Sequence, residues 1–215
     1  MEPAAAADDR LADCPMDVEV TPPVAIGQGY FDYQRFKVAM REPGKPARTL
    51  TRDIVRGGRV AAILPYDPHR NEIVLIQQFR LTAHLALGLG EMVEIVAGRV
   101  EPNEDLIETA RRECVEEIGL EPSVLKELIT YLPTPGVTDE AITIFLGIVD
   151  AENLPERAGA VDEQEETRPV RASIDAALAA LAAGRVHNGN LVIALQWLAL
   201  NRQRLGELSS ATATV

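Results

Sequence analysis

Alternating apolar and polar positions in the first part of the chain predict two β-hairpins. The β-prone segments 30–40 and 49–55 flank a turn rich in proline and glycine, and the apolar runs 60–64 and 72–79 flank a second, polar turn. Short β-prone segments joined by such turns are typical of antiparallel hairpins. We therefore expect two successive pairs of neighbouring strands before residue 80.

After residue 80 the chain mixes short apolar runs with helical spacing. The apolar runs predict three strands, at 92–97, 125–131 and 141–149. The helical spacing predicts three helices, at about 104–118, 173–184 and 188–204, and the first should end at Gly119 as its C-cap. Residues 98–103 and the acidic segment 153–168 are expected to be loops. This order of elements favours an α+β fold with a mixed or antiparallel sheet.

Composition indicates a packed protein, since hydrophobic residues make up 47% of the 215 residues and charged residues 25%. This balance excludes wholesale disorder, and the length favours one domain with at most a small appendage. We divide the chain into a flexible segment at 1–23, a β-region at 24–58, a main domain at 59–208 and a flexible tail at 209–215.

The formal net charge is −12, and the acidic excess lies in two blocks, at 91–121 and 150–168. A chain this acidic has no general attraction for polyphosphate backbones, which argues against a nucleic-acid partner. Acidic residues gathered in short blocks indicate either solvated faces or cation sites. The spacing inside the first block favours a cation site, as argued below.

The cysteines and histidines exclude two classes of small-domain scaffold. Two cysteines cannot form a disulfide framework, and no cysteine–histidine spacing fits structural zinc. We expect the histidines to lie on the surface, in loops or at a helix start. These residues are Cys14, Cys114, His69, His84 and His187.

The termini and the apolar stretches give no sign of a membrane or export function. The N-terminus lacks the basic and apolar regions of a signal peptide. The longest strongly apolar stretch, 191–200, is interrupted by Gln196 and is too short to span a bilayer. We expect a soluble cytoplasmic protein that makes no membrane contact.

One segment carries charged residues and glycines at a fixed spacing. Five residues separate Gly98 from Glu104, and seven more lead to Arg112. The complete set is Gly98, Glu104, Arg112, Glu113, Glu116, Glu117, Gly119 and Leu120. This spacing resembles the signature box of the Nudix hydrolase family, with Cys114 standing at a position that is usually apolar.

Helical geometry gives the box a physical meaning. At about 100° per residue, Glu113, Glu116 and Glu117 fall within an arc of roughly 100° on the predicted helix. Like charges so close together destabilise a helix, so a cation is expected between them, and hard divalent cations such as Mg²⁺ prefer oxygen ligands. A second arc should face the core, and it contains Ile107, Ala110, Cys114 and Ile118.

The resemblance implies a Nudix fold, in which a mixed β-sheet is sandwiched between helices, here with an N-terminal antiparallel β-region. It implies two or three Mg²⁺ ions, with Mn²⁺ as a substitute. The implied metal ligands are the carbonyl of Ala97 and the carboxylates of Glu113, Glu116, Glu117 and Glu165. Glu163, one of several adjacent acids, matches the family's general base. Gly98, Glu104, Arg112 and Gly119 match structural positions, with Glu104 and Arg112 forming an internal ion pair.

Residues outside the box resemble the ADP-ribose pyrophosphatase branch of the family. Pro135 lies sixteen residues after Gly119, an offset found in that branch. The resemblance implies that Tyr30 and Phe31 stack the adenine and that Arg52 and Asp53 contact the base and its ribose. It implies that Arg80 and Arg99 contact the phosphates or the terminal ribose. The loop over the second ribose is implied to contain Thr134, Pro135, Gly136 and Glu140. Where a relative has an arginine that contacts the substrate, this chain has Gly57, and Arg56 stands one position away.

The implied activity is hydrolysis of the pyrophosphate bond of ADP-ribose to AMP and ribose 5-phosphate. A nucleotide-sugar pyrophosphatase, for example one acting on GDP-mannose, remains an alternative, and so does a catalytically silent nucleotide sensor. The resemblance also implies a homodimer with the N-terminal strands exchanged or docked between subunits. The aromatic pair would then act within its own subunit or in the site of the partner.

Overall fold

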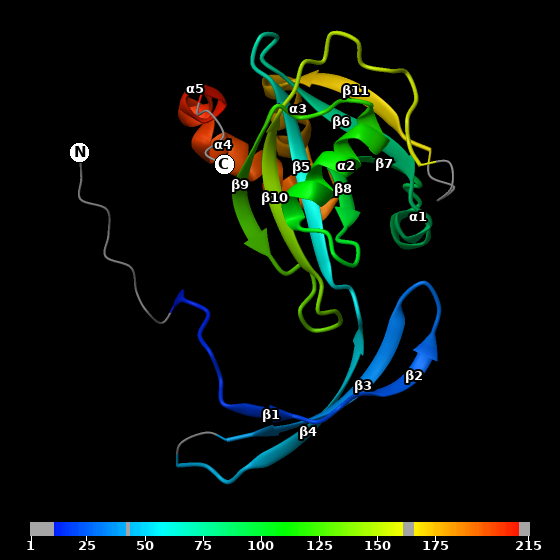
Figure 1. Cartoon of the computed structure of the whole chain (residues 1–215), viewed down its shortest axis with the longest axis vertical. Coiled ribbons are helices and arrows are strands. Elements are labelled where there is room, and N and C mark those ends of the chain that lie inside the picture. Colours follow the sequence, from blue (N-terminus) through cyan, green and yellow to red (C-terminus); the bar gives the residue numbers. More distant parts are fainter. Residues whose placement is uncertain (1–10, 42–43, 161–165, 211–215) are drawn as a thin grey trace, which may run out of the picture. The chain divides into compact units, whose positions relative to one another are not determined.

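The computed structural model describes residues 11–41, 44–160 and 166–210. The chain forms two compact units, one ending at Arg56 and one beginning at Gly57 (Figure 1). The boundary lies two residues before the one expected from the sequence. Within the described ranges, no helix is long and apolar enough to cross a membrane.

The first unit is a four-stranded antiparallel sheet. Its strands are β1 (Val18–Val20), β2 (Val24–Gln28), β3 (Asp32–Met40) and β4 (Arg48–Val55). Strand β3 is central, because β1 and β2 pair with its two ends along one edge and β4 pairs with its other edge. The hairpin expected from 30–40 and 49–55 is thus present. Strand β1 lies within 1–23, a segment that the sequence predicted to be flexible. It is formed by pairing with Val38–Met40, which are distant in the chain and leave no local signal.

The second unit contains a seven-stranded mixed sheet. Its strands are β5 (Arg59–Asp67), β6 (Glu72–Phe79), β7 (Glu91–Glu94), β8 (Val96–Arg99), β9 (Val124–Tyr131), β10 (Ala141–Ile148) and β11 (Arg168–Ser173). The main order is β11-β6-β5-β10-β9, with β7 paired to β6 and β8 paired to β5. Among the strand pairs of the described residues in this sheet, only β5 and β10 are parallel. Strands β5 and β6 pair directly only next to their turn, which leaves room for β7 and β8 farther along.

The helices follow local capping signals. They are α1 (Leu81–Leu87), α2 (Leu106–Ile118), α3 (Ile174–Ala182), α4 (Gly189–Asn201), the 3₁₀ turn η2 (Arg202–Arg204) and α5 (Leu205–Ser210). Asp105 and Glu108 form a reciprocal capping box at the start of α2, and Gly119 ends that helix with a φ of 68°. The side chains of Ser173 and Asn188 cap α3 and α4.

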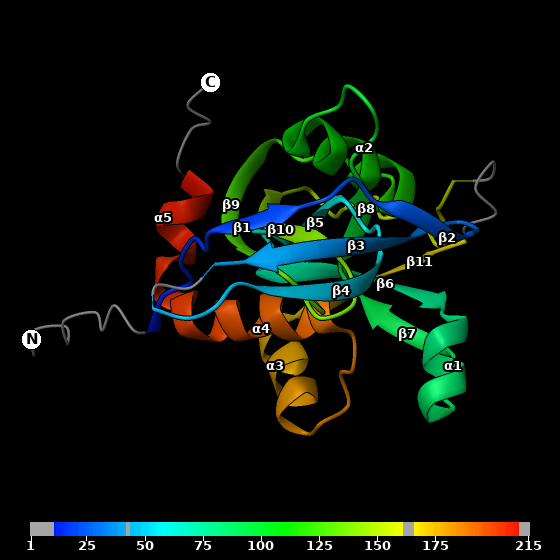
Figure 2. The same cartoon turned by 90° about the horizontal axis from the view of Figure 1, so that it is seen from below.

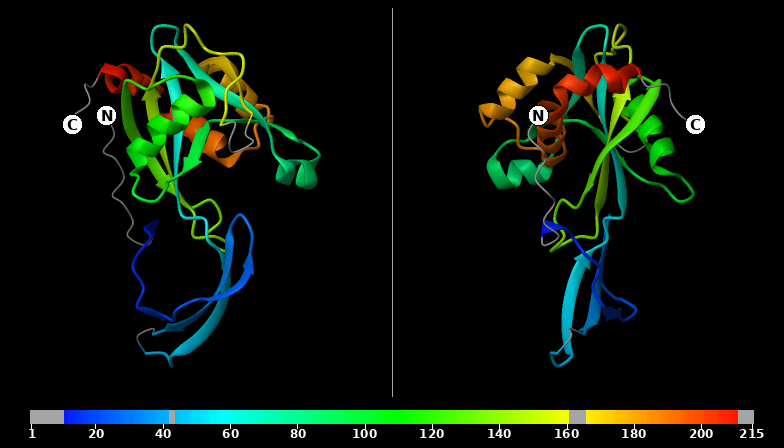
Figure 3. Two further views of the ribbon diagram at one scale, coloured as in Figure 1. Left: turned by 45° about the vertical axis from the view of Figure 1, so that its right-hand side comes forward. Right: turned by 90° about the vertical axis from the view of Figure 1, so that its left-hand side faces the viewer.

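The sheet of the second unit is covered by helices on both faces (Figures 2 and 3). Alternate residues of β5 point to opposite sides, as a strand requires. Ala62 and Leu64 join the core beneath α3, α4 and α5, whereas Ala61 and Ile63 join the core beneath α2. The expectation of a mixed sheet sandwiched between helices is confirmed.

Several predicted boundaries are wrong, and strand pairing explains the clearest case. The run 92–97 is two strands, because β7 pairs with β6 and the chain then crosses to β5 as β8. Strand β11, which begins at the last residue of the expected loop, was not predicted, since pairing with β6, rather than apolar alternation, defines this edge strand. The predicted last helix is divided into α4 and η2, and α5 follows beyond its predicted end.

Two expectations about side chains are also wrong. Ile107 was expected in the core, but it is 49% exposed, because Leu106 takes the packing position in the first turn of α2. His84 lies in α1 rather than in a loop. That helix has only seven residues and buries none of them, so it lacks the long buried stripe by which a sequence indicates a helix.

A buried carboxylate joins the β5–β6 turn to the chain after β10. Asp67 is fully buried, and its two oxygens accept hydrogen bonds from the amides of His69, Arg70 and Ala151 and from the Arg70 guanidinium. Burial alone would raise the pKa of Asp67, but these hydrogen bonds outweigh burial and lower the pKa below its usual value.

We expect Asp67→Ala to lower the free energy of unfolding by about 2–4 kcal/mol, because buried amides would lose their acceptor. Urea unfolding measures the change. Asp150→Ala is the matched control: Asp150 pairs with the same Arg70, but its side chain is 67% exposed, so a loss of about 0–1 kcal/mol is expected. Equal losses in the two variants would contradict the assigned role of Asp67.

Candidate functional site

The site forms where β8 meets α2. Ala97 and Gly98 lie on β8, paired with Ala62 and Ala61 of β5. Gly98 faces the Glu113 carboxylate so closely that a Cβ atom at position 98 would lie 1.7 Å from Glu113 Oε1. A side chain at position 98 would therefore displace the Glu113 carboxylate, so glycine here leaves room for that carboxylate rather than serving an unusual backbone angle.

The three carboxylates expected on one arc of the helix differ in burial. Glu117 is 1% exposed and Glu113 7% exposed, whereas the Glu116 side chain is 35% exposed. Glu117 Oε2 accepts a hydrogen bond of 3.0 Å from the Ala97 amide. Buried charges are costly unless they are paired, so the polar groups around them determine whether the cluster is stable.

Arg112 supplies the principal compensating charge. Its guanidinium contacts Glu104 at 3.0 Å, Glu113 at 2.6 Å and Glu116 at 2.9 Å, and also donates to the carbonyl of Arg99. The expected ion pair between Arg112 and Glu104 is thus present. The hydrogen bond from Arg112 is the largest cause that lowers the pKa of Glu104 to about 2, and the same pairing raises the pKa of Arg112.

The donor chemistry of this cluster fits a hard divalent cation. Glu113, Glu116 and Glu117 share one side of α2, where Glu117 meets the Ala97 amide and Glu113 lies against Gly98. Among the described residues, however, no three acidic, cysteine or histidine side chains already converge as a metal centre. Arg112 bonds to two of the carboxylates, so a bound cation would compete with it for their oxygens.

The remaining acidic candidates, Glu163 and Glu165, lie outside the described residues. The chain on either side of them is tied to the end of α2. The Gly159 amide and the Thr167 hydroxyl each donate a 2.7 Å hydrogen bond, to the carbonyls of Glu116 and Glu117 respectively. Thr167 is fully buried, and sequence reasoning did not single it out, because a threonine within a loop carries no distinguishing local signal.

Arg80, expected to contact phosphate, is held by a buried acid. Its guanidinium donates to Glu94 at 2.9 to 3.2 Å, and Gln78 donates to the same carboxylate at 3.2 Å. Glu94 is 5% exposed and was not among the expected site residues. Its position in an apolar run, spaced by two from the buried Met92, is the signal that could have identified it.

Arg99 and Glu140 are near neighbours. Burial raises the pKa of Glu140, the positive charge of Arg99 opposes that rise, and Asp139 adds to it. The expected loop residues Thr134, Pro135 and Gly136 form an exposed turn closed by a hydrogen bond from the Val137 amide to the Thr134 carbonyl. The structure thus places two of the expected substrate contacts side by side.

Four of the candidate substrate-binding residues lie in the first unit. The rings of Tyr30 and Phe31 pack edge to face with centroids 4.8 Å apart. Asp53 forms a two-bond ion pair of 2.7 Å with Arg35, its direct cross-strand partner, and this pairing lowers the pKa of Asp53. Arg52 donates to the carbonyl of Thr51. Sequence reasoning missed Arg35, which only the register of β3 and β4 identifies.

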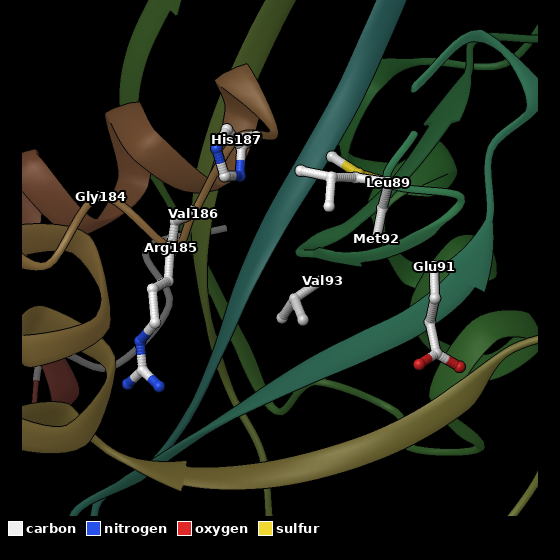
Figure 4. Close-up of a pocket in the computed structure, with 8 residues that line it drawn as sticks. All are labelled: Leu89, Glu91, Met92, Val93, Gly184, Arg185, Val186 and His187. Carbon is white, nitrogen blue, oxygen red and sulfur yellow. The ribbon is translucent and has the colours of Figure 1, made fainter. Parts of the chain in front are cut away.

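A separate pocket of about 290 Å³ lies between β7 and the segment that joins α3 to α4 (Figure 4). None of the residues expected to bind metal or substrate lines it. All three histidines are exposed, as expected, and His187 lies at this pocket. The lining residues are Leu89, Glu91, Met92, Val93, Gly184, Arg185, Val186 and His187.

Comparison with known proteins gives three informative matches. The model of the NUDIX domain matches residues 56–193. The ADP-ribose pyrophosphatase of Escherichia coli (strain K12) is 36% identical over 191 residues, which are 88% of this chain and 91% of that protein. The GDP-mannose pyrophosphatase of Klebsiella pneumoniae is 30% identical over 149 residues, 68% of this chain and 74% of that protein.

The fold also matches a solved structure, that of an "ADP compounds hydrolase", with a TM-score of 0.66 and 16% sequence identity. The match covers 92% of this chain and 100% of the other. At this identity the likeness supports the fold alone.

The low pKa of Glu104 gives a prediction for stability against pH. Because the folded-state pKa of about 2 lies below the ordinary 4.5, Glu104 stabilises the fold fully above about pH 5. This contribution should be lost as the pH falls from about 4.5 to about 2. The difference in unfolding free energy between the wild type and Glu104→Gln, measured in urea at each pH, should shrink over that range.

Glu101→Gln removes an exposed carboxylate from the same turn and serves as the control. If the difference in unfolding free energy between the wild type and Glu104→Gln stays constant down to pH 2, Glu104 and Arg112 are not paired in solution.

Proposed function

We propose that this chain, which belongs to the Nudix family, hydrolyses the pyrophosphate bond of ADP-ribose to AMP and ribose 5-phosphate. The observation that carries the proposal is the pair of buried carboxylates, Glu113 and Glu117, held against the backbone of β8. The substrate is supported by the likeness to the E. coli ADP-ribose pyrophosphatase, which extends over 88% of the chain.

Nudix hydrolases generally use divalent metal ions, and we propose two or three Mg²⁺ ions here, with Mn²⁺ as a substitute. Glu113, Glu116 and Glu117, the carbonyl of Ala97 and Glu165 would hold them. Bound ions of this kind neutralise charge on the diphosphate and lower the pKa of a coordinated water. Arg112 keeps Glu113 and Glu116 in place through contacts of 2.6 and 2.9 Å.

The other groups orient the substrate and move one proton. Glu163 accepts the proton from the attacking water as general base. Arg80, held in place by Glu94, and Arg99 meet the diphosphate, a role that the planar guanidinium suits. Because the reaction breaks one phosphorus–oxygen bond and forms another, correct alignment of the diphosphate is the main task of these residues.

The branch resemblance divides the remaining substrate contacts into two sets. Tyr30 and Phe31 stack the adenine, while Arg52 and Asp53 contact the base and its ribose. The second ribose lies against Glu140 and the turn at 134–136. These assignments rest on the branch resemblance.

A GDP-mannose pyrophosphatase activity is the second candidate, favoured by the 30% identity to the Klebsiella protein. A nucleotide sensor without catalysis is disfavoured, because the chain retains all the box glutamates. The activity itself, rather than the fold, distinguishes these alternatives.

Incubation with ADP-ribose, GDP-mannose and other nucleoside diphosphate conjugates in ¹⁸O water, followed by product analysis, tests the proposal. We expect AMP and ribose 5-phosphate from ADP-ribose, in the presence of Mg²⁺, at the highest kcat/KM of the panel. Glu117→Gln should lose turnover by roughly a factor of 10² or more while remaining folded, since a glutamine oxygen can still accept from the Ala97 amide.

Glu121→Gln, which changes an exposed acid close to the same helix, should keep the wild-type rate. Faster cleavage of GDP-mannose would support the second candidate, and an absence of products across the panel would support the sensor. A Glu117→Gln variant with near wild-type turnover at saturating Mg²⁺ would refute the metal assignment.

We further propose that the protein is a cytoplasmic homodimer joined through the first unit. Between residues 11 and 56, none of the described side chains is buried. The exposed apolar side chains of the first unit include Val18, Val20, Val24, Ile26, Tyr30, Phe31 and Tyr33. A sheet that buries none of its apolar side chains is too weakly packed to be stable alone, so a second copy is the expected cover.

The solution mass should be twice 23.4 kDa in sedimentation at micromolar concentration. Val24→Asp, which places a charge on the exposed apolar surface of β2, should weaken the dimer and lower turnover together. Lys37→Ala on the neighbouring strand β3 makes the chain more negative in the same way without altering the apolar surface, so it serves as the control for the change in net charge. A monomeric wild type with full activity would contradict the dimer.

A further inference from the structure

Position 57 has no room for a side chain. A Cβ atom there would lie 2.5 Å from the Cβ of Glu140 and 2.6 Å from the hydroxyl oxygen of Thr138. Gly57 is itself buried. The chain from 138 to 140 therefore lies directly against the backbone at the start of the second unit, and any larger residue would push it away.

Hydrogen bonds hold this close approach. The Gly57 amide donates to Oδ1 of Asp139 at 2.8 Å, and the Glu140 amide donates to the Thr138 hydroxyl at 3.1 Å. One residue later, the Ala141 amide donates to the carbonyl of Gly58 at 2.9 Å, and the parallel pairing of β10 with β5 begins. The bond from the Gly57 amide to Asp139 thus continues the contact between these two segments to just before the start of β10.

This attachment determines where Glu140 stands. Glu140 is half-buried, close to the guanidinium of Arg99 and the carboxylate of Asp139. On the other side of Gly57, a Cβ at Gly58 would lie 3.8 Å from the Arg99 guanidinium. Both charged groups, Arg99 and Glu140, therefore lie next to the same short stretch of backbone.

We propose that Asp139 is a positioning residue, whose hydrogen bond to the Gly57 amide holds the 134–140 segment so that Glu140, beside Arg99, faces the sugar beyond the diphosphate. The inference rests on the proposed function, in which Glu140 contacts the second ribose. It assigns no chemical step to Asp139. Gly57 is the matching partner, because only glycine leaves the space that the segment fills.

The first test separates the hydrogen bond from the charge. Asp139→Ala removes the acceptor, whereas Asp139→Asn keeps an oxygen at Oδ1 and removes only the charge. Loss of the bond should raise the KM for ADP-ribose by about five- to tenfold with kcat changed less than about twofold, and Asp139→Asn should restore most of the affinity. Gly57→Ala should reproduce the effect of Asp139→Ala.

Inhibition by AMP, which lacks the second sugar, provides the specificity control. Its inhibition constant should stay within about twofold of the wild-type value in Asp139→Ala, because the effect is confined to the sugar side. In a double-mutant cycle, Asp139→Ala should add little to the KM of Glu140→Gln, since both act through one contact. Glu121→Ala is the matched acidic control elsewhere on the surface.

Hydrogen exchange provides a readout that does not depend on activity. The Gly57 amide should exchange faster in Asp139→Ala than in the wild type and in Asp139→Asn. An unchanged KM in Asp139→Ala, an equal loss in Asp139→Asn, full additivity with Glu140→Gln, or unchanged exchange would each overturn the inference.

A wild type that cleaves another conjugate instead of ADP-ribose would refute the proposed substrate. The same variants would then be measured on the conjugate that is cleaved, and the exchange experiment stands without any substrate.

Discussion

The contact between the Glu113 carboxylate and the backbone of Gly98 is the constraint on which the site depends. The Glu113 carboxylate can occupy this place only because position 98 lacks a Cβ atom, which would lie 1.7 Å from Glu113 Oε1. Beside it, Glu117 accepts a hydrogen bond from the Ala97 amide. The glycine and the neighbouring amide thus hold two carboxylates against one strand, and the rest of the box supports that arrangement.

Burying two carboxylates side by side would be unfavourable without compensation, which Arg112 provides for Glu113 and the Ala97 amide provides in part for Glu117. One guanidinium bonds to Glu104, Glu113 and Glu116, so the cluster is paired even without a metal ion. Glu104 is itself fixed by the Thr109 hydroxyl. In the proposed reaction a cation takes over part of this compensation, which links metal binding to the arrangement of Arg112.

Local signals in the sequence were sufficient for the helix that carries the box. Gly119 ends α2 as expected, and the Asp105–Glu108 capping box fixes a start about two residues later than the spacing indicated. The stripe of Ala110, Cys114 and Ile118 is buried, whereas Ile107 is not. Periodicity reports which side of a helix faces inward, but the extent of the covering sheet decides how far along the helix that burial continues.

The sequence by itself determined the family, the α+β class and the carboxylates that share one side of α2, because residues three and four apart on a helix are neighbours whatever surrounds them. Only the tertiary structure decided the partners of Arg80, Asp53 and Asp139. These are Glu94, Arg35 and Gly57, separated from them by 14, 18 and 82 positions in the chain. Such contacts depend on strand order and register, which arise from the packing of the whole sheet and leave no local pattern in the sequence.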